Sequence, residues 1–420
     1  MIFYSFWQST GTMKHHLIVS ALVVLVSVLG CSSFAQAADF GEDVAFLKQY
    51  TDVIVLQDAK GQSKVALVPA WQGRAMTSTA GGDKGLSFGW INRELIASKK
   101  FAEHINVFGG EDRFWMGPEG GQYSIFFAKG AKFELADWYT PAAIDTEPFQ
   151  VAKKTTDRAI FTAKFKLTNY SGTAFDVAVE REVRLLDAKT AWQRLGAAPA
   201  RDVTLVAFES DNRVTNAGPE AWKKETGLLS IWILGMFNPS PSTTIVVPIN
   251  PGPESELGVQ VTSDYFGAIP PERLVVKDRV IYFSADGNYR SKIGINPQRS
   301  KSVLGSYDAD NKVLTIVQFS QQPGVTDYVN SLWKIQDNPY GGDAANSYND
   351  GPPSPGAKPL GPFYELESSS AAAALAPQKS LSHTHRTVHL SGSEEELDKV
   401  AQELLGVTLQ EIKNGLKQSQ

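Results

Sequence analysis

The sequence predicts a mainly β protein: one large antiparallel β-sandwich with short helices at its C-terminal end. Short runs of alternating apolar and polar residues follow one another with turn residues between them, and no long helical period occurs before residue 390. The composition agrees, because 35 Gly and 22 Pro supply tight turns, and 9 Trp, 22 Phe and 13 Tyr suit strands.

The clearest strand signal lies between residues 159 and 186. There Phe161, Ala163, Phe165 and Leu167 recur at every second position, which places them on one buried face. The stretches 53–56 and 65–68, joined by a turn at 58–61, predict a β-hairpin. Further strands are expected at 124–127, 203–208, 228–233, 243–247, 275–283, 313–320 and 363–367.

The first 37 residues have the pattern of a signal peptide. A basic Lys14 precedes an apolar run at 17–29 that is too short to span a membrane comfortably. Small residues at Ala35-Gln36-Ala37 suit a signal peptidase, so the mature chain is expected to start at Ala38. The stretch before Cys31 also resembles a lipobox, which would make Cys31 a lipid anchor. Both interpretations predict export, to the periplasm or beyond.

Cysteine count and charge exclude several kinds of protein. Cys31 is the only cysteine among 420 residues, so the mature chain is expected to have no disulfide, no thiol nucleophile and no cysteine metal site. Without the signal peptide, 39 basic and 45 acidic residues remain, a net charge of −6 (39 − 45). Such a balance does not attract nucleic acid. A monomer without a transmembrane segment in its mature part is expected.

Residues 38–392 are expected to form the sandwich as one domain, and 393–420 a helical extension packed on it. Ser393 and Glu396 fit a capping box for a helix reaching about residue 405, and Thr408 opens a second helix. The Gly-, Asn-, Asp- and Pro-rich stretch 339–362 has the composition of a linker or of an ordered active-site loop. We favour the loop, because a strand pair follows directly and the stretch carries few charges.

Residues 361–390 carry most of the expected chemistry. Period two places Glu365 and Glu367 on one face of a first strand, and His383, His385 and His389 on one face of a second. If the apolar faces of both strands point to the core, these groups converge on one open face. A carboxylate beside an imidazole suits proton transfer at neutral pH. A solvated strand face is the competing interpretation, but three of the four His outside the signal peptide fall within 383–389.

The segment Leu366-Glu367-Ser368-Ser369 is followed by Leu375-Ala376-Pro377 and then by the His383–His389 strand. This succession resembles the C-terminal hallmark of the galactose mutarotase-like (aldose 1-epimerase) superfamily. The resemblance implies a supersandwich with a sugar site on its concave face and Glu367 as catalytic base. We assign the acid/base partner to His385 or His383. The superfamily's central His is missing between positions 104 and 383, where Trp232 stands instead, so the chain resembles a distinct exported branch.

The segment 106–122 predicts contacts to sugar hydroxyls. Glu111, Asp112, Arg113 and Glu119 supply donors and acceptors, and Trp115 offers a flat apolar face for a pyranose ring. The segment also resembles a Gly-rich, Arg-containing sugar-binding segment of the superfamily, which maps Arg113 onto a hydroxyl-binding position. A structural turn with an Arg–carboxylate pair is the competing interpretation. Further substrate-binding candidates are Trp90, Asn346, Tyr348 and Glu365.

These features predict an extracytoplasmic carbohydrate-active protein without a resident cofactor. Three classes stay open: an enzyme of the epimerase, glycoside hydrolase or polysaccharide lyase type; a non-catalytic carbohydrate-binding protein; and a structural envelope protein. In a lyase, Arg113 would neutralise a uronate carboxylate. A divalent metal held by His383, His385 and Glu367 is a further alternative, because imidazole and carboxylate groups suit zinc, manganese or iron.

Overall fold

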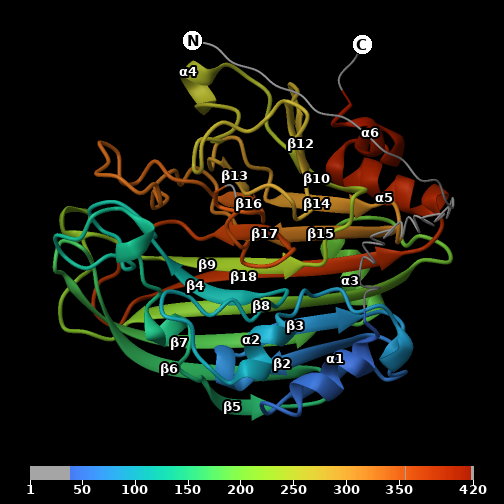
Figure 1. The fold of residues 1–420 in the computed structure, drawn as a ribbon, viewed down its shortest axis with the longest axis horizontal. Coiled ribbons are helices and arrows are strands. Elements are labelled where there is room, and N and C mark those ends of the chain that lie inside the picture. The colour runs from blue at the N-terminus through green and yellow to red at the C-terminus, as the bar shows by residue number, and fades with distance from the viewer. Residues whose placement is uncertain (1–37, 355, 418–420) are drawn as a thin grey trace, which may run out of the picture. The chain divides into compact units, whose positions relative to one another are not determined.

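The structure is a computed structural model that describes residues 38–354 and 356–417. These residues form three antiparallel sheets, and the two larger sheets pack face to face (Figure 1). The predicted fold class, a mainly antiparallel β-sandwich with short C-terminal helices, is confirmed. The predicted signal peptide, its cleavage site and Cys31 lie outside the described residues.

The largest sheet has ten strands. From one edge to the other they are β11 (Leu274–Val276), β12 (Val280–Ser284), β10 (Thr243–Pro248), β14 (Val303–Asp308), β15 (Val313–Phe319), β18 (Ser380–Ser391), β8 (Thr204–Asn216), β7 (Ala174–Leu185), β6 (Arg158–Thr168) and β5 (Gln150–Lys154).

The second sheet has five strands, in the order β13 (Ser291–Ile295), β16 (Ala345–Asn349), β17 (Tyr364–Ser369), β9 (Ser230–Phe237) and β4 (Arg113–Gly117). The third sheet consists of β1 (Ile54–Gln57), β2 (Lys64–Val68) and β3 (Arg74–Thr79). The strands of the five-stranded sheet bring together residues that lie far apart in the sequence.

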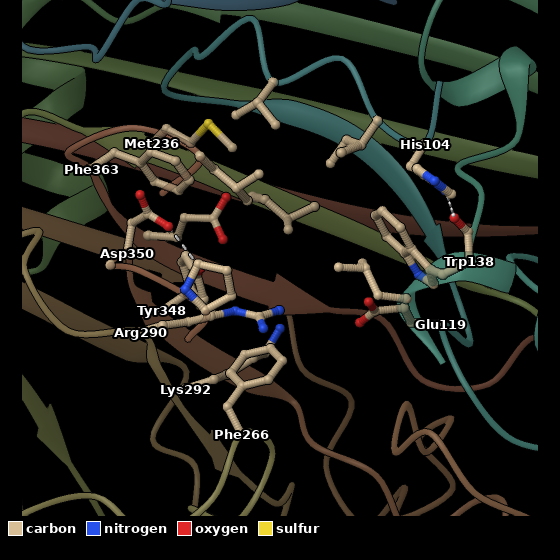
Figure 2. Close-up of a pocket in the computed structure, with 18 of the residues that line it drawn as sticks. His104, Glu119, Trp138, Met236, Phe266, Arg290, Lys292, Tyr348, Asp350 and Phe363 are labelled. Carbon is tan, nitrogen blue, oxygen red and sulfur yellow. Dashed lines mark hydrogen bonds between the residues drawn. The ribbon is translucent and has the colours of Figure 1, made fainter. Parts of the chain in front are cut away.

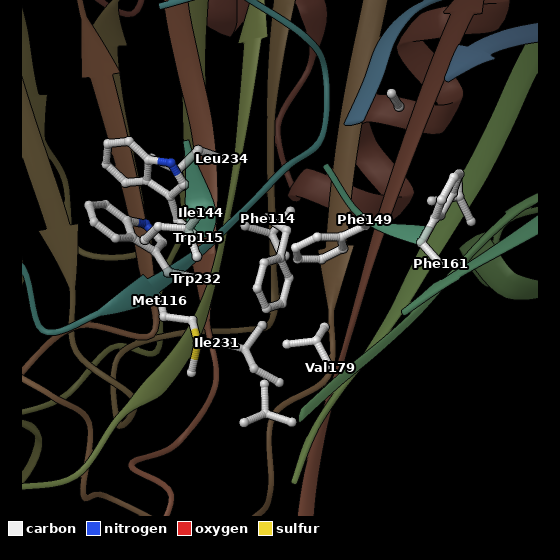
Figure 3. Close-up of a cluster of buried hydrophobic side chains, with 14 of the residues drawn as sticks. Phe114, Trp115, Met116, Ile144, Phe149, Phe161, Val179, Ile231, Trp232 and Leu234 are labelled. Carbon is white, nitrogen blue, oxygen red and sulfur yellow. The ribbon is translucent and has the colours of Figure 1, made fainter. Parts of the chain in front are cut away.

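Apolar side chains fill the space between the two larger sheets. Phe114 of β4 and Ile231 of β9 pack in one cluster with Phe149 and with Val179 of β7 (Figure 3). The rings of Phe114 and Phe149 meet edge to face, with centroids 5.7 Å apart. Because side chains alternate along a strand, the residues next to Phe114 and Ile231 point to the opposite face of the five-stranded sheet.

The helices are short: α1 (Phe40–Leu47), α2 (Arg93–Ser98), α3 (Ala188–Leu195), α4 (Glu254–Leu257), α5 (Glu394–Leu405) and α6 (Leu409–Asn414). Single 3₁₀ turns occur at Pro69–Trp71, Gly82–Lys84, Leu135–Asp137, Ala142–Ile144 and Lys224–Thr226. Within residues 38–354 and 356–417, the helices lack the length and apolar character that a membrane span requires.

Helices α5 and α6 cover part of the ten-stranded sheet. They contact β10 and β14 (Figure 1, red), and Leu397 and Ile412 join the apolar cluster on that face of the sheet. The capping box predicted at Ser393 is half formed: the Ser393 hydroxyl accepts a hydrogen bond from the Glu396 amide, but the Glu396 carboxylate accepts one from the Arg201 amide. Thr408 forms a reciprocal capping box with Glu411.

Most predicted strands are confirmed, including the hairpin of β1 with β2 and the pairing of β6 with β7. The predicted strand at 124–127 is wrong, because only Phe127 makes an isolated bridge, to Trp138. Its apolar residues are buried as a loop instead. The single strand predicted at 275–283 is the hairpin of β11 and β12. Helices α1 and α3 were not predicted, because two turns are too short to establish a helical period.

Candidate functional site

One cavity lies on the face of the five-stranded sheet that points away from the ten-stranded sheet. We call it the outer pocket; its volume is about 280 Å³. The sheet contributes Arg113, Trp115, Trp232, Leu234, Met236, Lys292, Tyr348 and Glu365 to its lining. These positions alternate with Phe114, Ile233, Ile293 and Leu366, which pack between the two sheets. The alternation of the strands therefore sets which side chains face the pocket.

Loops complete the wall of the outer pocket. They contribute His104, Ile105, Val107, Glu119, Leu135, Trp138, Phe266, Arg290, Trp333, Asp350, Gly351, Pro353, Lys358, Leu360 and Phe363 (Figure 2). His104 is held in place by the carbonyl oxygen of Trp138, 2.7 Å from its Nδ1. Several of these residues belong to the stretch 339–362. Its described residues contain β16 and line the pocket, so they form a pocket loop, as expected, and do not link two domains.

Arg113 and Glu365 form a buried pair in the pocket wall. Arg113 Nη2 donates to Glu365 Oε1 at 3.1 Å, and the two side chains are 3% and 7% exposed. The guanidinium lies 4.0 Å from the ring centroid of Trp115, so that one face of this ring is occupied. Burial raises the pKa of Glu365 to about 8, although Arg113 opposes the shift; Glu367 adds to it.

Lys292 and Glu367 form a second buried pair. Lys292 Nζ and Trp232 Nε1 donate to Glu367 Oε2 at 3.1 and 2.8 Å. Burial acts to lower the pKa of Lys292, but the carboxylates around it, chiefly Glu367 and Glu119, outweigh burial and raise it. Lys292 is therefore a firmly charged ammonium group. Glu367 is fully buried beneath Trp232 and Lys292, and it does not line the pocket.

Glu119 is the third acidic group of this region. It lines the pocket, and burial raises its pKa, with Lys292 opposing the shift. Asp350 lines the pocket too; it accepts hydrogen bonds from the Tyr348 hydroxyl at 2.9 Å and the Gly361 amide at 2.8 Å. Burial raises the pKa of Asp350 to about 6. The outer pocket thus combines aromatic walls with cations and with carboxyl groups that gain protons easily.

The structure separates the Glu and His residues that we expected on one open face. His383 and His385 lie on β18 of the ten-stranded sheet and point between the sheets, where the Ser368 hydroxyl lies 2.8 Å from a nitrogen of each ring. Glu367 lies on the opposite face of β17 from Ser368. The predicted Glu367–His pair is therefore wrong, because β17 and β18 belong to different sheets. Burial lowers the pKa values of His383 and His385 to about 3 and 4.

His389, Glu111 and Asp112 also lie between the sheets. His389 Nε2 is 2.9 Å from Glu111 Oε2, and Glu111 also accepts a hydrogen bond from the Ser78 hydroxyl at 2.8 Å. Asp112 Oδ1 accepts from Arg181 at 2.6 Å. All three side chains are buried, and they do not line the outer pocket. The expectation that Glu111 and Asp112 bind hydroxyls in this pocket is wrong, because their side chains hold the sheets together.

The remaining predicted residues lie at or near the outer pocket. Trp90 does not line the pocket but packs against the lining residue Phe363, with ring centroids 4.8 Å apart. Asn346 faces a neighbouring small cavity of about 10 Å³ and donates to the Tyr265 hydroxyl at 3.2 Å. Of the predicted residues, Arg113, Trp115, Glu119, Tyr348 and Glu365 line the pocket itself.

The sequence of this chain matches one known protein family over nearly all of its described length. A family of unknown function (DUF6786) matches residues 38–416. The chain belongs to the DUF6786 family. No curated protein matches it.

Solved structures resemble the DUF6786 chain at low identity. The Slr1438 protein of Synechocystis sp. PCC 6803 is 14% identical, with 82% of this chain and 96% of that chain covered and a TM-score of 0.48. A putative aldose 1-epimerase of Escherichia coli K12 is 13% identical, with 81% and 99% covered and a TM-score of 0.46. A galactose mutarotase-like protein of Lactobacillus casei is 11% identical, with 81% and 100% covered and a TM-score of 0.43.

Several pocket residues of the DUF6786 chain were not predicted. Trp138, Trp333 and Phe266 come from loops without a motif. Lys292 had a signal: it is the one charged residue in the apolar strand Ser291–Ile295, where Ile293 and Ile295 face the core. A charged lysine within a buried strand is costly unless a carboxylate pairs with its ammonium group, so Lys292 predicts a buried acidic partner.

The residues of this DUF6786 chain do not fit the metal site considered above. Glu367 and the two histidines lie on opposite sides of β17. In the part of the chain that the structure describes, no group of three His, Cys, Asp or Glu side chains is arranged to hold a metal ion.

Proposed function

We propose that this chain is an exported protein that binds a sugar or a short oligosaccharide in the outer pocket. The observation that carries the proposal is the combination of aromatic walls with buried, charged groups in one cavity of about 280 Å³. Sugars present apolar C–H faces beside hydroxyl groups, and aromatic rings beside charged side chains match both. The volume lies near the lower end of ligand pockets, about 300 Å³, so one or two sugar units fit.

Buried polar atoms without a partner support the proposal. Arg113 Nε and Nη1, Trp115 Nε1 and Trp138 Nε1 have no hydrogen-bond partner within residues 38–354 and 356–417. All three residues line the outer pocket. An unsatisfied buried donor costs about 1–3 kcal/mol, and hydroxyl groups of a ligand are suited to accept these hydrogen bonds.

In the catalytic form of the proposal, Glu365 replaces Glu367 as the catalytic carboxyl group and acts as a general acid. Glu365 lines the pocket, and its raised pKa keeps a proton available near neutral pH. Glu367 is buried and already bound by Lys292 and Trp232. A non-catalytic binding protein is the second candidate, because the histidines expected as acid/base partners lie between the sheets.

Replacing Trp333 with Ala is expected to weaken sugar binding at least tenfold, about 1.4 kcal/mol. Trp333 lines the pocket, is half-buried, and stacks on Trp138 with centroids 5.8 Å apart, so its loss opens one aromatic wall. A glycan array selects the ligand, and calorimetry measures its affinity for both proteins. Tyr289→Ala is the control, because this ring is 36% exposed and lies outside the pocket lining. An array without any bound glycan, or equal affinities for wild type and Trp333→Ala, overturns the proposal.

Sugar affinity is expected to fall as the pH rises through about 8, where Glu365 loses its proton. A protonated carboxyl group both donates and accepts hydrogen bonds, whereas a carboxylate only accepts. Glu365→Gln keeps a donor and an acceptor without titrating, so its affinity is expected to stay constant over the same pH range. Glu220→Gln, at an exposed position, should behave like wild type. A wild-type affinity that does not change through pH 8 would show that Glu365 makes no such contact.

A further inference from the structure

We infer that the sugar carries an anionic group, the carboxylate of a uronic acid or the sulfate of a sulfated sugar, which binds between Arg290 and Lys292 in the outer pocket. The inference rests on the proposed function and names the substrate class of the same site. It starts from Arg290, which no sequence motif singled out.

Arg290 is a cation without an ionic partner. Among the described residues its side chain makes no ion pair and no hydrogen bond, although it lines the pocket. Its guanidinium lies 3.9 Å from the ring centroid of Phe266, which is 40% exposed. In Figure 2 the guanidinium of Arg290 and the amine of Lys292 both point toward the middle of the pocket. A planar guanidinium held against a ring is suited to bind a carboxylate or sulfate through two parallel hydrogen bonds.

Asp350 does not satisfy Arg290. Its two carboxyl oxygens accept hydrogen bonds from the Tyr348 hydroxyl and the Gly361 amide. Arg290 acts on Asp350 only as a nearby charge, a weaker influence on its pKa than burial. The donors of the guanidinium thus remain directed at the cavity.

The charges of the lining favour an anion as well. Its cations are Arg113, Arg290, Lys292 and Lys358, and its acidic groups are Glu119, Asp350 and Glu365. Burial raises the pKa values of all three acids, which favours their neutral forms. Lys358 is largely exposed and pairs loosely with Glu94 at 3.3 Å. The lining thus carries four cationic and three acidic side chains, on a chain whose net charge is −5.

This negative net charge makes the test specific. A protein that repels polyanions as a whole does not bind acidic glycans through general attraction, so retention points to a local site. The probe is an array of matched glycans that share one backbone and differ only in a hydroxymethyl group, a carboxylate or a sulfate. Affinities of the full chain for bound glycans are then measured by calorimetry at low and high salt.

The acidic member of a matched set is expected to bind at least tenfold more tightly than the neutral member, with an affinity that falls as salt rises. Arg290→Gln should lower the affinity for the acidic member at least tenfold more than the affinity for the neutral member and so remove the preference, whereas Arg290→Lys should keep part of it. Arg279→Gln is the control, because this side chain is 76% exposed. Preference for the carboxylate or for the sulfate identifies which of the two is bound.

Equal binding of neutral and acidic members overturns the inference and leaves the proposed sugar-binding function intact. A preference that survives in Arg290→Gln also overturns it, because the anion then binds elsewhere. Absence of any bound glycan overturns both the inference and the proposed function. Thermal unfolding of each variant shows that the compared proteins are folded.

Discussion

Lys292→Met is expected to lower the free energy of unfolding by about 3–5 kcal/mol. The substitution leaves the carboxylate of Glu367 buried, with a side chain 0% exposed, and removes its cation at 3.1 Å. Trp232 Nε1 remains as a donor to Oε2, while Oε1 has no partner in the described part of the chain. A buried charge with one hydrogen bond is costly because neither water nor an opposite charge stabilises it. Denaturant unfolding followed by tryptophan fluorescence measures the loss.

The double variant Lys292→Met/Glu367→Gln is expected to recover a large part of this loss, since no unpaired charge stays behind. Lys224→Met is the matched control: Lys224 pairs with Asp327 at 2.5 Å, but these side chains are 49% and 44% exposed, so a change within about 1 kcal/mol is expected. A Lys292→Met protein as stable as wild type would show that the Lys292–Glu367 pair does not stabilise the fold.

The periodicity of the sequence predicted the local structure of the strands well. Phe161 and Leu167 on β6 are buried as the alternation required, and β6 pairs with β7 over its whole length. Alternation is a local property, so one sequence suffices to recognise it. The loop at residues 124–127 shows the limit, because buried aromatic residues occur in loops that cover a core as well as in strands.

The candidate site was predicted only in part, because faces can be inferred locally and sheet membership cannot. Glu365 and Glu367 do share one face of β17, and His383, His385 and His389 do share one face of β18. The step that failed was the assumption that these strands are neighbours. β17 pairs with β16 and β9, whereas β18 pairs with β15 and β8. Strand order depends on contacts between distant segments, which periodicity does not encode.

The segment that begins at Gly109 was also predicted only in part, because its sequence does not show which way each side chain points. Its residue types suit hydroxyl binding, but the chain directs neighbouring side chains to different places: Asp112 turns between the sheets, and Arg113 turns into the outer pocket. Glycine at 109 and 110 is required by the fold, because both have positive φ angles and a Cβ at Gly109 would lie 2.1 Å from the Trp90 carbonyl oxygen. The glycines thus let strands approach each other, and they are not needed to admit a ligand.

Arg181→Met is also expected to destabilise the fold by about 3–5 kcal/mol. The substitution removes the hydrogen bonds that hold Asp112 between the sheets and away from the pocket. Arg181 and Asp112 are both 0% exposed, and the guanidinium donates to Asp112 Oδ1 at 2.6 Å and to Asn212 Oδ1 at 2.5 Å. It also donates to the Asp112 carbonyl oxygen at 3.1 Å. Methionine leaves a buried carboxylate without a cation. Arg158→Met is the control, because Arg158 is 38% exposed and lies 3.7 Å from Glu182, so its loss should stay within about 1 kcal/mol.

Measuring the sugar affinity of an Asp112 variant distinguishes two roles of this residue: a structural role in the fold, and the contact to a ligand that the sequence predicted. Asp112→Asn keeps the shape of the side chain and removes its charge, so it should destabilise the fold by unpairing Arg181. Because Asp112 does not line the outer pocket, the folded Asp112→Asn protein is expected to bind sugar as tightly as wild type. Calorimetry at a temperature where both proteins are folded measures this affinity. A tenfold weaker affinity with unchanged stability would return Asp112 to the binding site and would contradict the placement of the outer pocket.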